Sequence, residues 1–473
     1  MRRLPSFGDG GGGKFRQVIA AFLAQPGLPF ASVLSAERVE RVFAKHDNLF
    51  GMDSIYSAAI TVWAFLGQAL RDGKEASCQS AVAQIVTHQQ VAGGPVPTSD
   101  TGDYCRARAK LSEAALHDLT TELASELEQQ PDPAWLWKKR HAKLIDGFTF
   151  TMPDTPANQK EYPQQSQQKP GVGFPIARAC AILSLATACV TDLALGPCRG
   201  KETGETALLR EMLDALHIGD IAVFDRCFCS FLMIGLLLGR KVDVCARMHQ
   251  IRHVDFRRGQ RLGKYDHLIE WTKPDRPAWM DEATYATIPE KIVLREIRFN
   301  VVEPGRRAHT LTIVTTLIDP EVYTKEDIAE LYGFRWNSEL DIRSIKQSLG
   351  LDHVRCKSPE MVRKELWTTL LGYNLIRTTA AAAALVHDKQ PRQISFTATC
   401  QYVLSSWMLM SLDLITAQNI LGHCKLLLLQ ISQCEVANRP GRLEPRELKR
   451  RRHRYKLMQE PRDVLKAKLQ NRN

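Results

Sequence analysis

The spacing of apolar residues along the chain separates helical from extended stretches. Near the N-terminus, apolar positions recur at helical spacing in residues 54–70, 78–91 and 112–127. Between the last two runs, P-V-P-T-S-D-T has the composition of a loop and a helix N-cap, and it leads into a basic helix at 102–111. These patterns predict a region of helices joined by short turns.

From His141 the pattern changes to alternating, β-branched and aromatic residues, which favours strands. The expected order is strands at 144–152 and twice within 177–195, a helix at 205–216, a strand ending at Asp225, a helix at 231–238 and a strand at 242–248. Such an order is typical of an α/β fold. Asp146 lies in the first strand and Asp225 ends the fourth, and sheets of this kind place their sites at strand ends.

A second extended region follows before residue 320. Residues 291–302 and 309–318 are rich in β-branched residues and are joined by E-P-G-R-R, which predicts a long hairpin. The apolar frame shifts between Leu294 and Ile297, and this shift indicates a β-bulge.

Residues 328–349 contain no proline and one glycine, and their apolar residues recur at helical spacing. At 100° per residue, four functional side chains share an arc of about 60° on one helix: Tyr332, Arg335, Glu339 and Lys346. Asp341 points to the opposite side, and we expect it to face outward. A stripe of this kind is usually a solvated face with ion pairs. Two cations with a single acid, among aromatic residues, favour a functional face here.

Composition and charge indicate a globular protein with an anionic partner. The 473 residues are 44% hydrophobic and 24% charged, which allows about two to four domains. The formal net charge is +11, and residues 439–473 hold 13 Lys/Arg against 4 Asp/Glu. Such a basic tail predicts nucleic acid before membrane as the partner. A non-specific, partly disordered polyanion binder is the alternative.

Cysteine usage and hydropathy predict a cytosolic protein. The 12 cysteines are scattered without a C-x-x-C pair, so we expect reduced thiols and no structural zinc. The apolar run at 18–24 is too short for a signal peptide core. Asn374 and Arg377 interrupt the long apolar stretch within 359–386, so this stretch and 397–430 are expected to be packed helices rather than membrane spans.

The spacing Y-(2)-R-(3)-E-(6)-K around Glu339 resembles the motif of the insertion-sequence-four family of DDE transposases. Three upstream segments resemble the same family in the same order: D-G-F-T-F-T-M-P-D-T-P-A-N, Q-K-P-G-V-G-F-P and D-I-A-V-F-D-R-C-F. The resemblance covers about residues 98–390. It implies an α/β, RNase H-like catalytic core in which Asp146, Asp225 and Glu339 bind metal ions. Cys227 stands where the family more often has glycine.

The resemblance also implies regions around this core. An N-terminal helical region would bind DNA ends, a β-rich insertion would interrupt the core before the catalytic helix, and a helical region with a basic tail would end the chain. The expected boundaries are 1–135 for the end-binding region, 136–248 and 322–390 for the two parts of the core, 249–321 for the insertion and 391–473 for the C-terminal region.

The reaction that the resemblance implies is cut-and-paste transposition. Two Mg²⁺ ions, replaceable by Mn²⁺, are expected at the three carboxylates, about 3.5–4 Å apart. Water would free a 3′-OH at a terminal inverted repeat, and this hydroxyl would form a hairpin before strand transfer into target DNA. We expect double-stranded DNA as the partner, a dimer on the DNA ends, no membrane partner, and a prokaryotic cytoplasmic location at the nucleoid.

Further side chains are expected to contact DNA. Those on the predicted catalytic helix are Tyr332, Arg335, Trp336 and Lys346. In the basic helix at 102–111, Arg106 and Arg108 would either lie on DNA or form a solvated face, and the sequence favours neither. In the insertion, Trp271 or Trp279 could stack on a flipped base, although a hydrophobic anchor is the commoner role.

Alternatives remain for the ligands and for the activity. Asp154 opens a loop after a proline and Asp220 precedes its strand, so a structural role is favoured for both over metal binding. A structure-specific nuclease on the same core would keep the three acids without strand transfer. A non-catalytic, transposase-derived DNA-binding protein would keep only the basic surfaces.

Overall fold

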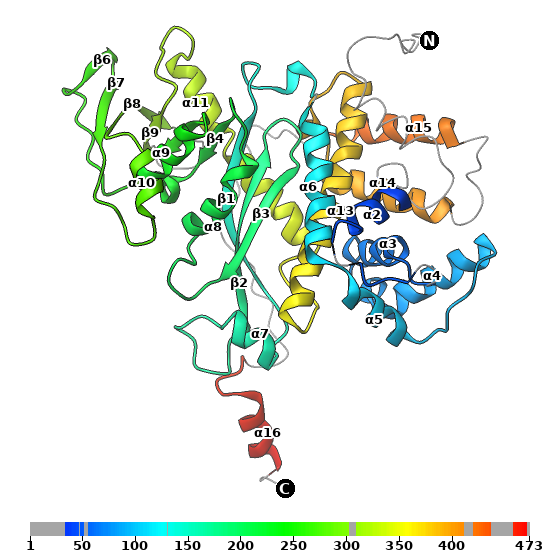
Figure 1. Cartoon of the computed structure of the whole chain (residues 1–473). Helices are drawn as coiled ribbons and strands as arrows, with labels where there is room; N and C mark the ends of the chain where they lie inside the picture. Colours follow the sequence, from blue (N-terminus) through cyan, green and yellow to red (C-terminus); the bar gives the residue numbers. More distant parts are fainter. Residues whose placement is uncertain are drawn as a thin grey trace.

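The computed structural model describes residues 34–46, 48–51, 55–129, 131–301, 309–410, 420–436 and 457–470. Within these residues, a nine-stranded sheet has the strand order β3-β2-β1-β4-β5-β9-β8-β7-β6. Figure 1 shows the strands β6–β9 at one end of the molecule and the helices α2–α5 at the other. The basic stretch 437–456 and the tip of the predicted hairpin lie outside the described residues.

Five strands form the part of the sheet that carries the predicted aspartates. They are β1 (Ala142–Thr151), β2 (Ile176–Ser184), β3 (Val190–Pro197), β4 (Ile221–Phe224) and β5 (Asp243–Arg247). β1, β4 and β5 are parallel neighbours, whereas β2 and β3 continue antiparallel from β1. All four residues of β4 are buried, as expected for a central parallel strand covered on both faces. The predicted strands of this region are confirmed.

Four more strands extend the same sheet. They are β6 (Gln260–Gly263), β7 (Asp266–Thr272), β8 (Lys291–Val301) and β9 (His309–Thr315). β8 and β9 pair antiparallel as predicted, and β9 pairs antiparallel with β5. The β-rich segment is therefore continuous with the central sheet.

The predicted β-bulge in β8 is wrong, because the register of β8 with both neighbours is unbroken. The apparent frame shift has another cause: Arg295 and Glu296 are both buried between Leu294 and Ile297. Arg295 forms a two-pronged ion pair with Asp266, with distances of 2.8 and 2.6 Å. Buried charges that are paired in this way make a strand look polar where both of its faces are covered.

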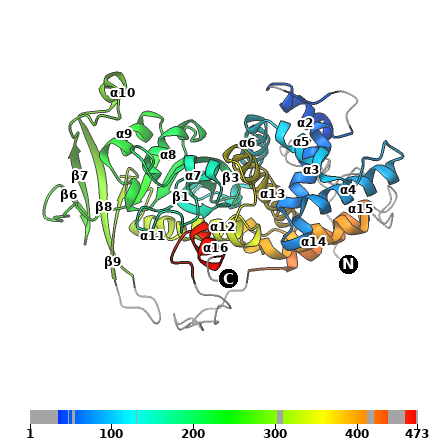
Figure 2. The ribbon, with the colours of Figure 1, turned by 90° about the horizontal axis from the view of Figure 1, so that it is seen from below.

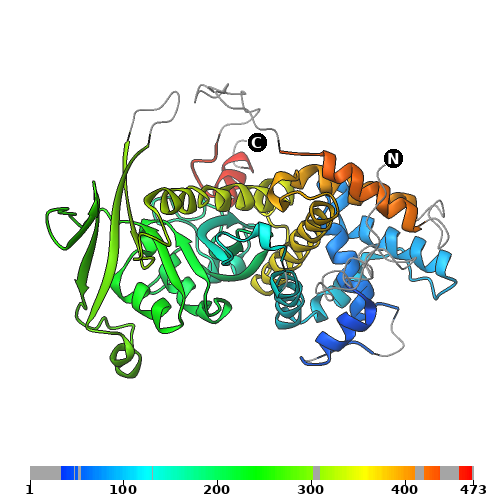
Figure 3. The same ribbon diagram turned by 90° about the horizontal axis from the view of Figure 1, so that it is seen from above.

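Helices cover both faces of the sheet (Figures 2 and 3). One face carries α8 (Glu205–Glu211), α9 (Phe231–Gly239) and, beside the insertion, α10 (Glu282–Thr287). The other face shares one apolar core with α11 (Lys325–Gly333), α12 (Trp336–Arg343) and α13 (Pro359–Val386). The N-terminal region consists of α2 (Ala36–Phe43), α3 (Ala58–Ala69), α4 (Cys78–Ala92), α5 (Thr101–Lys110) and α6 (Glu113–Gln129). Of these helices, α3 and α6 pack against α13, whereas α4 and α5 pack on α3 and α2 packs on α3 and α6.

The remaining helices are short or lie near the C-terminus. They are α7 (Pro156–Glu161), α14 (Phe396–Met410), α15 (Ile420–Gln433) and α16 (Arg462–Gln470). The described residues also include six single-turn segments: η1 (Gly73–Ala76), η2 (Pro133–Trp135), η3 (Leu213–Ala215), η4 (Arg226–Phe228), η5 (Ser344–Ser348) and η6 (Pro391–Gln393). In the described part of the chain, no helix is long and apolar enough to cross a membrane.

The predicted single helix over 328–349 is divided in the structure. α11 begins at a capping box of Thr324 and Asp327 and ends at Gly333, the residue type with the lowest helix propensity apart from proline. Hydrogen bonds from Arg335 N to Tyr332 O and from Ser338 N to Arg335 O, each 3.0 Å, then tighten the chain into 3₁₀-type turns before α12 proceeds.

A wider turn follows α12. The segment η5 is π-helical and inserts an extra residue before Leu349, whose N–H bonds to Ser344 O at 3.2 Å. The uniform 100° rotation used for the sequence prediction therefore does not extend from Tyr332 to Lys346.

The prediction that Asp341 faces outward is wrong. Its side chain is 2% exposed, because α13 and the segment after it cover the side of α12 that the helical pattern assigned to solvent. Asp341 Oδ1 accepts a hydrogen bond from Arg377 Nη2 at 2.8 Å, and its Oδ2 lies 2.8 Å from Arg392 Nη1. Asp341 thus fixes α12 to the helical region behind it.

Candidate functional site

Two parallel strands bring the two predicted aspartates together. Asp146 lies within β1, and Asp225 directly follows β4. Ile145 pairs with Phe224 across these strands, so the next residues, Asp146 and Asp225, come level with each other. Because side chains alternate along a strand, Asp146 shares the face of Leu144, which packs in the core that includes α11–α13.

An arginine at the start of helix α12 links Glu339 to the first of these aspartates. Arg335, at the start of the helix, donates from Nη2 to Glu339 Oε1 at 2.8 Å. Its other terminal nitrogen, Nη1, donates to Asp146 Oδ2 at 3.4 Å. One guanidinium therefore bridges a carboxylate on the helix and a carboxylate on the sheet.

Ser338 is a site residue that the sequence prediction missed. Its side chain is fully buried, and its Oγ lies 2.8 Å from Asp146 Oδ2, to which it donates. The backbone N–H of Gly147 donates to the other oxygen, Oδ1, at 2.9 Å. Both oxygens of Asp146 are therefore oriented. The sequence feature that could have identified Ser338 is its position three residues after Arg335, which places both residues on the same helical face.

Burial is the main cause that raises the pKa of Asp146. The hydrogen bond from Ser338 and the charge of Arg335 act in the opposite direction, whereas the charge of Glu339 raises the pKa further. Burial alone would lower the pKa of Arg335, but the hydrogen bond to Glu339 and the surrounding negative charges raise it. The guanidinium of Arg335 therefore stays charged, and its positive charge balances the two carboxylates beside it.

A fourth carboxylate, also missed, approaches from the other face of the sheet. Glu205, at the start of α8, packs over Gly147, where an added Cβ would lie 2.2 Å from the Glu205 carboxyl carbon. Cys227 Sγ lies 3.7 Å from Glu205 Oε2. Burial raises the pKa of Glu205, Arg178 lowers it, and Asp146 raises it. The sequence feature that could have indicated Glu205 is the glycine directly after Asp146, because a residue without a Cβ lets the Glu205 carboxylate come close to the strand.

The other predicted residues of the catalytic helix have different surroundings. Tyr332 is 8% exposed, and burial raises the pKa of its hydroxyl, to which the nearby Asp225 also contributes. Trp336 is 48% exposed at the start of α12. Lys346 forms an ion pair with Asp352 at 2.9 Å instead of contacting a carboxylate of the predicted triad. The structure thus groups Tyr332 and Arg335 with the acids and places Lys346 after the π-helical turn.

The two arginines predicted on α5 differ from each other. Arg106 is exposed and pairs with Asp103 on the same helix. The guanidinium of Arg108 lies 4.8 Å from the centre of the Phe65 ring and donates to Gln68 Oε1 at 3.3 Å. Arg108 therefore joins α5 to α3, and of the two only Arg106 lies on the open surface.

The rival aspartates have local structural partners. Asp154 Oδ1 accepts from Gln159 Nε2 at 2.8 Å, and Asp220 Oδ2 accepts from His217 N at 2.9 Å. These local contacts match the structural roles expected for both aspartates.

The tryptophans of the insertion also differ. Trp271 is 6% exposed and donates from Nε1 to Glu296 at 2.9 Å, as a buried anchor does. Trp279 is 36% exposed, with Arg210 3.8 Å from its ring centre.

The donor set suits a hard divalent cation. Asp146, Asp225 and Glu339 offer only carboxylate oxygens, the ligands that Mg²⁺ prefers. In the part of the chain that the structure describes, no three His, Cys, Asp or Glu side chains are arranged as a metal site. Arg335 compensates the charge of Asp146 and Glu339 here.

Comparisons with known proteins agree on one family. The model of the family described as "Transposase DDE domain" matches residues 137–375. "Transposase InsG for insertion sequence element IS4" of Escherichia coli (strain K12) is 27% identical over 403 residues, which cover 83% of this chain and 85% of that protein. A putative transposase, InsL of element IS186A from the same strain, is 30% identical over 99 residues, 19% of this chain and 26% of that protein.

A solved structure, the piggyBac transposase synaptic complex with hairpin DNA, resembles the chain with a TM-score of 0.40 and 9% identity. The similarity covers 87% of this chain and 85% of that one.

Proposed function

Because this chain belongs to the transposase DDE domain family, we propose that Asp146, Asp225 and Glu339 form the metal centre with which it cuts and joins DNA. The matched region spans half of the chain, and the similarity to the IS4 transposase covers most of both proteins. The chain is a transposase of an insertion sequence, a metal-dependent enzyme class that acts on DNA. The assignment of the three carboxylates is our inference.

One observation carries this assignment: α12 connects Glu339, through Arg335, to the aspartate that lies level with Asp225 on the parallel strand. Two strands and one helix would thereby supply the three carboxylates on one face of the sheet. When bound, Mg²⁺ would lower the pKa of an attacking water and offset the charge on a leaving 3′ oxygen. Ser338 and the Gly147 N–H would hold Asp146 in its orientation while it serves as a ligand.

Arg335 has a second role in this proposal. Its fork neutralises Asp146 and Glu339 in the structure described here. With those charges compensated by metal, the same fork can turn to a DNA phosphate, which it matches in shape and charge. Tyr332, with its hydroxyl protonated, could donate to an adjacent phosphate oxygen.

The arrangement of the sheet supports an RNase H-like core. The order β3-β2-β1-β4-β5, with β1, β4 and β5 parallel and helices on both faces, is the pattern expected of such a core. We assign 136–248 and 322–390 to it, 249–321 to the insertion, 1–135 to DNA-end binding, and 391–473 to a C-terminal region with the basic tail.

We infer the reaction that this core performs on the ends of its element. Hydrolysis of a phosphodiester at the terminal inverted repeat leaves a 3′-OH on the element. That hydroxyl attacks the opposite strand, closing a hairpin and releasing the 3′-OH of the flanking DNA. After the hairpin is reopened by water, the element 3′-OH attacks target DNA. The protein would assemble as a dimer on the paired ends, in the cytoplasm where the DNA lies.

Cleavage of DNA carrying the element's own ends tests the proposal. Asp146→Ala, Asp225→Ala and Glu339→Ala should each abolish Mg²⁺-dependent cleavage and strand transfer while leaving DNA binding intact. Asp154→Ala, which removes a carboxylate with a local turn role, is the matched control and should cut normally. Wild-type cleavage by any of the three variants would show that the wrong carboxylate was assigned. Cleavage without joining to a target plasmid would favour the nuclease alternative.

A further inference from the structure

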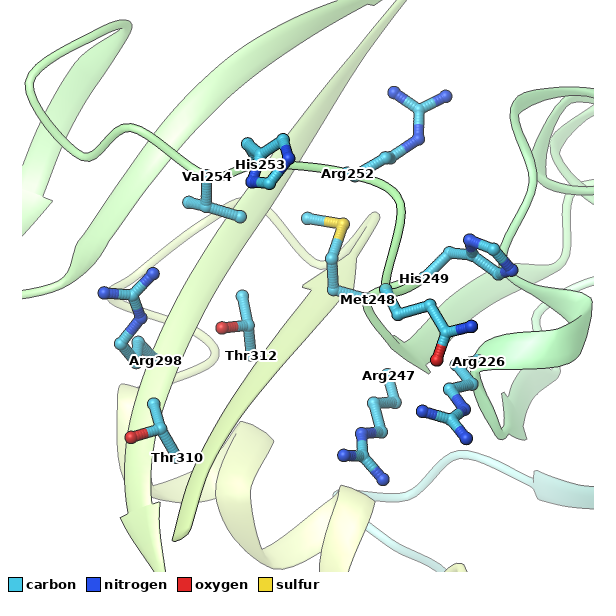
Figure 4. Close-up of a pocket in the computed structure, with 11 residues that line it drawn as sticks. Arg226, Arg247, Met248, His249, Arg252, His253, Val254, Arg298, Thr310 and Thr312 are labelled. Atoms are coloured by element: carbon cyan, nitrogen blue, oxygen red, sulfur yellow. The ribbon is translucent and has the colours of Figure 1, made fainter.

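A basic pocket of about 300 Å³ lies between the core and the insertion (Figure 4). Four arginines line it: Arg226 after β4, Arg247 at the end of β5, Arg252 in the following loop and Arg298 on β8. Figure 4 shows Thr310 and Thr312 on the neighbouring strand, beside Arg298. No aspartate or glutamate is among its lining residues.

In the described part of the chain, the arginines of this pocket have no direct ion-pair partner; burial lowers the pKa of Arg252, and the nearby Glu296 carboxylate opposes this effect. Among the described residues, none of these four arginines forms an ion pair with a carboxylate. Arg226 and Arg252 are exposed and Arg247 and Arg298 are half-buried, whereas the buried Arg295 and Arg377 have carboxylate partners. Four guanidinium groups around one cavity repel each other, so the pocket favours an anion over water.

Aromatic rings orient two of the arginines without neutralising them. The guanidinium of Arg252 lies 3.6 Å from the centre of the Trp271 ring, and that of Arg298 lies 4.8 Å from the centre of the Phe256 ring. Trp271 is itself fixed by its hydrogen bond to Glu296. Stacking of this kind restricts a guanidinium and leaves its N–H groups available for an anion, which lowers the ordering entropy of binding.

The pocket is next to the proposed metal centre. Arg226 directly follows Asp225, and Arg247 ends the strand adjacent to β4. A DNA strand that leaves the metal centre toward the insertion would therefore meet this pocket. The hydroxyls of Thr310 and Thr312 add neutral donors of the kind that complete phosphate sites.

We propose that this pocket binds one backbone phosphate of the DNA beside the bond that is cut. This inference rests on the proposed function for its ligand and assigns a binding role to Arg252 and Arg298. Arg298, with Thr310 and Thr312, would hold the phosphate from one side of the pocket, and Arg252 would supply charge from the other side, while Arg226 and Arg247 provide charge on the side of the metal centre. Trp271, covered by Arg252 on one face, keeps that guanidinium in place.

Salt dependence of DNA binding tests the proposal. For a duplex carrying the element end, the slope of log K against log salt should become shallower in Arg252→Gln and in Arg298→Gln, and by about 0.9 in the double variant, because the two arginines neutralise the same phosphate. Arg257→Gln removes the same charge from the same loop, but Arg257 is 90% exposed and already bound to Asp255, so its slope should stay near that of the wild type. An equal change in all three variants, or in none, would overturn the proposal.

A second measurement makes its main comparison with the wild-type protein alone. Wild-type protein is bound to a series of duplexes, each with one uncharged methylphosphonate linkage near the cut site. The methylphosphonate at one position should weaken binding of the wild-type protein several-fold. The same methylphosphonate should not weaken DNA binding by Arg298→Gln. The proposal is wrong if no single methylphosphonate weakens binding and inorganic phosphate protects the pocket arginines from a guanidine-specific reagent. In that case the pocket binds a free anion.

The outcome is separable from the proposed function. The same titrations can be made with Asp146→Ala and Glu339→Ala, because binding is read without cleavage. If these two variants cut DNA normally, the assignment of the metal centre fails, whereas a position-specific methylphosphonate effect would still establish the phosphate site.

Discussion

Replacing Asp341 with alanine tests whether this carboxylate holds the catalytic helix in place. Its side chain is 2% exposed and lies 2.8 Å from a terminal nitrogen of both Arg377 and Arg392. Arg377 also donates from Nε to the Tyr373 hydroxyl at 2.9 Å, deep within α13. The substitution would leave a buried arginine without its charge partner.

The expected cost follows from the burial of both partners. Removing one member of a buried ion pair costs about 3–5 kcal/mol, because the remaining charge stays desolvated. Arg377 is 7% exposed and fits this case, whereas Arg392 is 17% exposed and can recover some hydration. We therefore expect Asp341→Ala to lower the free energy of unfolding by about 3 kcal/mol or more. Asp341→Leu combined with Arg377→Met should cost less, because no unpaired charge remains on Arg377.

Urea unfolding followed by tryptophan fluorescence measures these differences. The matched control is Glu326→Ala, which removes an exposed acid in the first turn of α11 and should cost no more than about 1 kcal/mol. If Asp341→Ala cost no more than this control, Asp341 would be a solvent-facing residue, as the helical pattern alone indicates, and the packing of α12 on α13 described above would be wrong.

Three further predictions follow from the geometry. The exchange variant Glu339→Ala with Asp341→Glu should not recover cleavage, because residue 341 faces Arg377 instead of Asp146. The variant Glu339→Asp should retain reduced cleavage activity, which should be higher with Mn²⁺ than with Mg²⁺. Gly147→Ala should displace the Glu205 carboxylate, so its effect on cleavage and that of Glu205→Ala should be non-additive, and fully additive effects would contradict the contact. The hydrogen bond to Asp192 raises the pKa of His117 above its ordinary value, so its stabilising effect is complete below about pH 6.5 and is lost as the pH rises through the raised pKa. Unfolding at pH 6 should therefore show a larger cost of His117→Gln than unfolding at pH 9.

The local pattern was enough to predict the strands that carry Asp146 and Asp225. Alternation and buried β-branched runs are properties of neighbouring residues, and they survive in the sheet because both faces are covered. The parallel register that makes the two aspartates level is a tertiary property, but it follows from the α/β order of elements.

Other features depend on residues far away in the sequence. The burial of Asp341 requires Arg377, 36 residues later, and helical periodicity contains no information about what covers the second side of a helix. The approach of Glu205 to Gly147 depends on how α8 packs on the sheet. In β8, the pairing of Arg295 with Asp266 turned an apparent break in the apolar pattern into a continuous strand.

The division of the catalytic helix has a consequence for charge. The tight turns around Arg335 place its guanidinium between Glu339 and Asp146, where one cation serves two carboxylates. Without a cation, two neighbouring acids raise each other's pKa, as Glu339 does to Asp146. On the proposed function, the charge of Arg335 opposes the rise in the pKa of Asp146 in the metal-free site, and bound metal would take over this role and leave the guanidinium available for DNA. Lysine at position 335 would supply a charge but no fork, so it could serve one of the two acids at a time. Both the charge balance at Asp146 and Glu339 and the proposed contact with DNA thus depend on the same planar group.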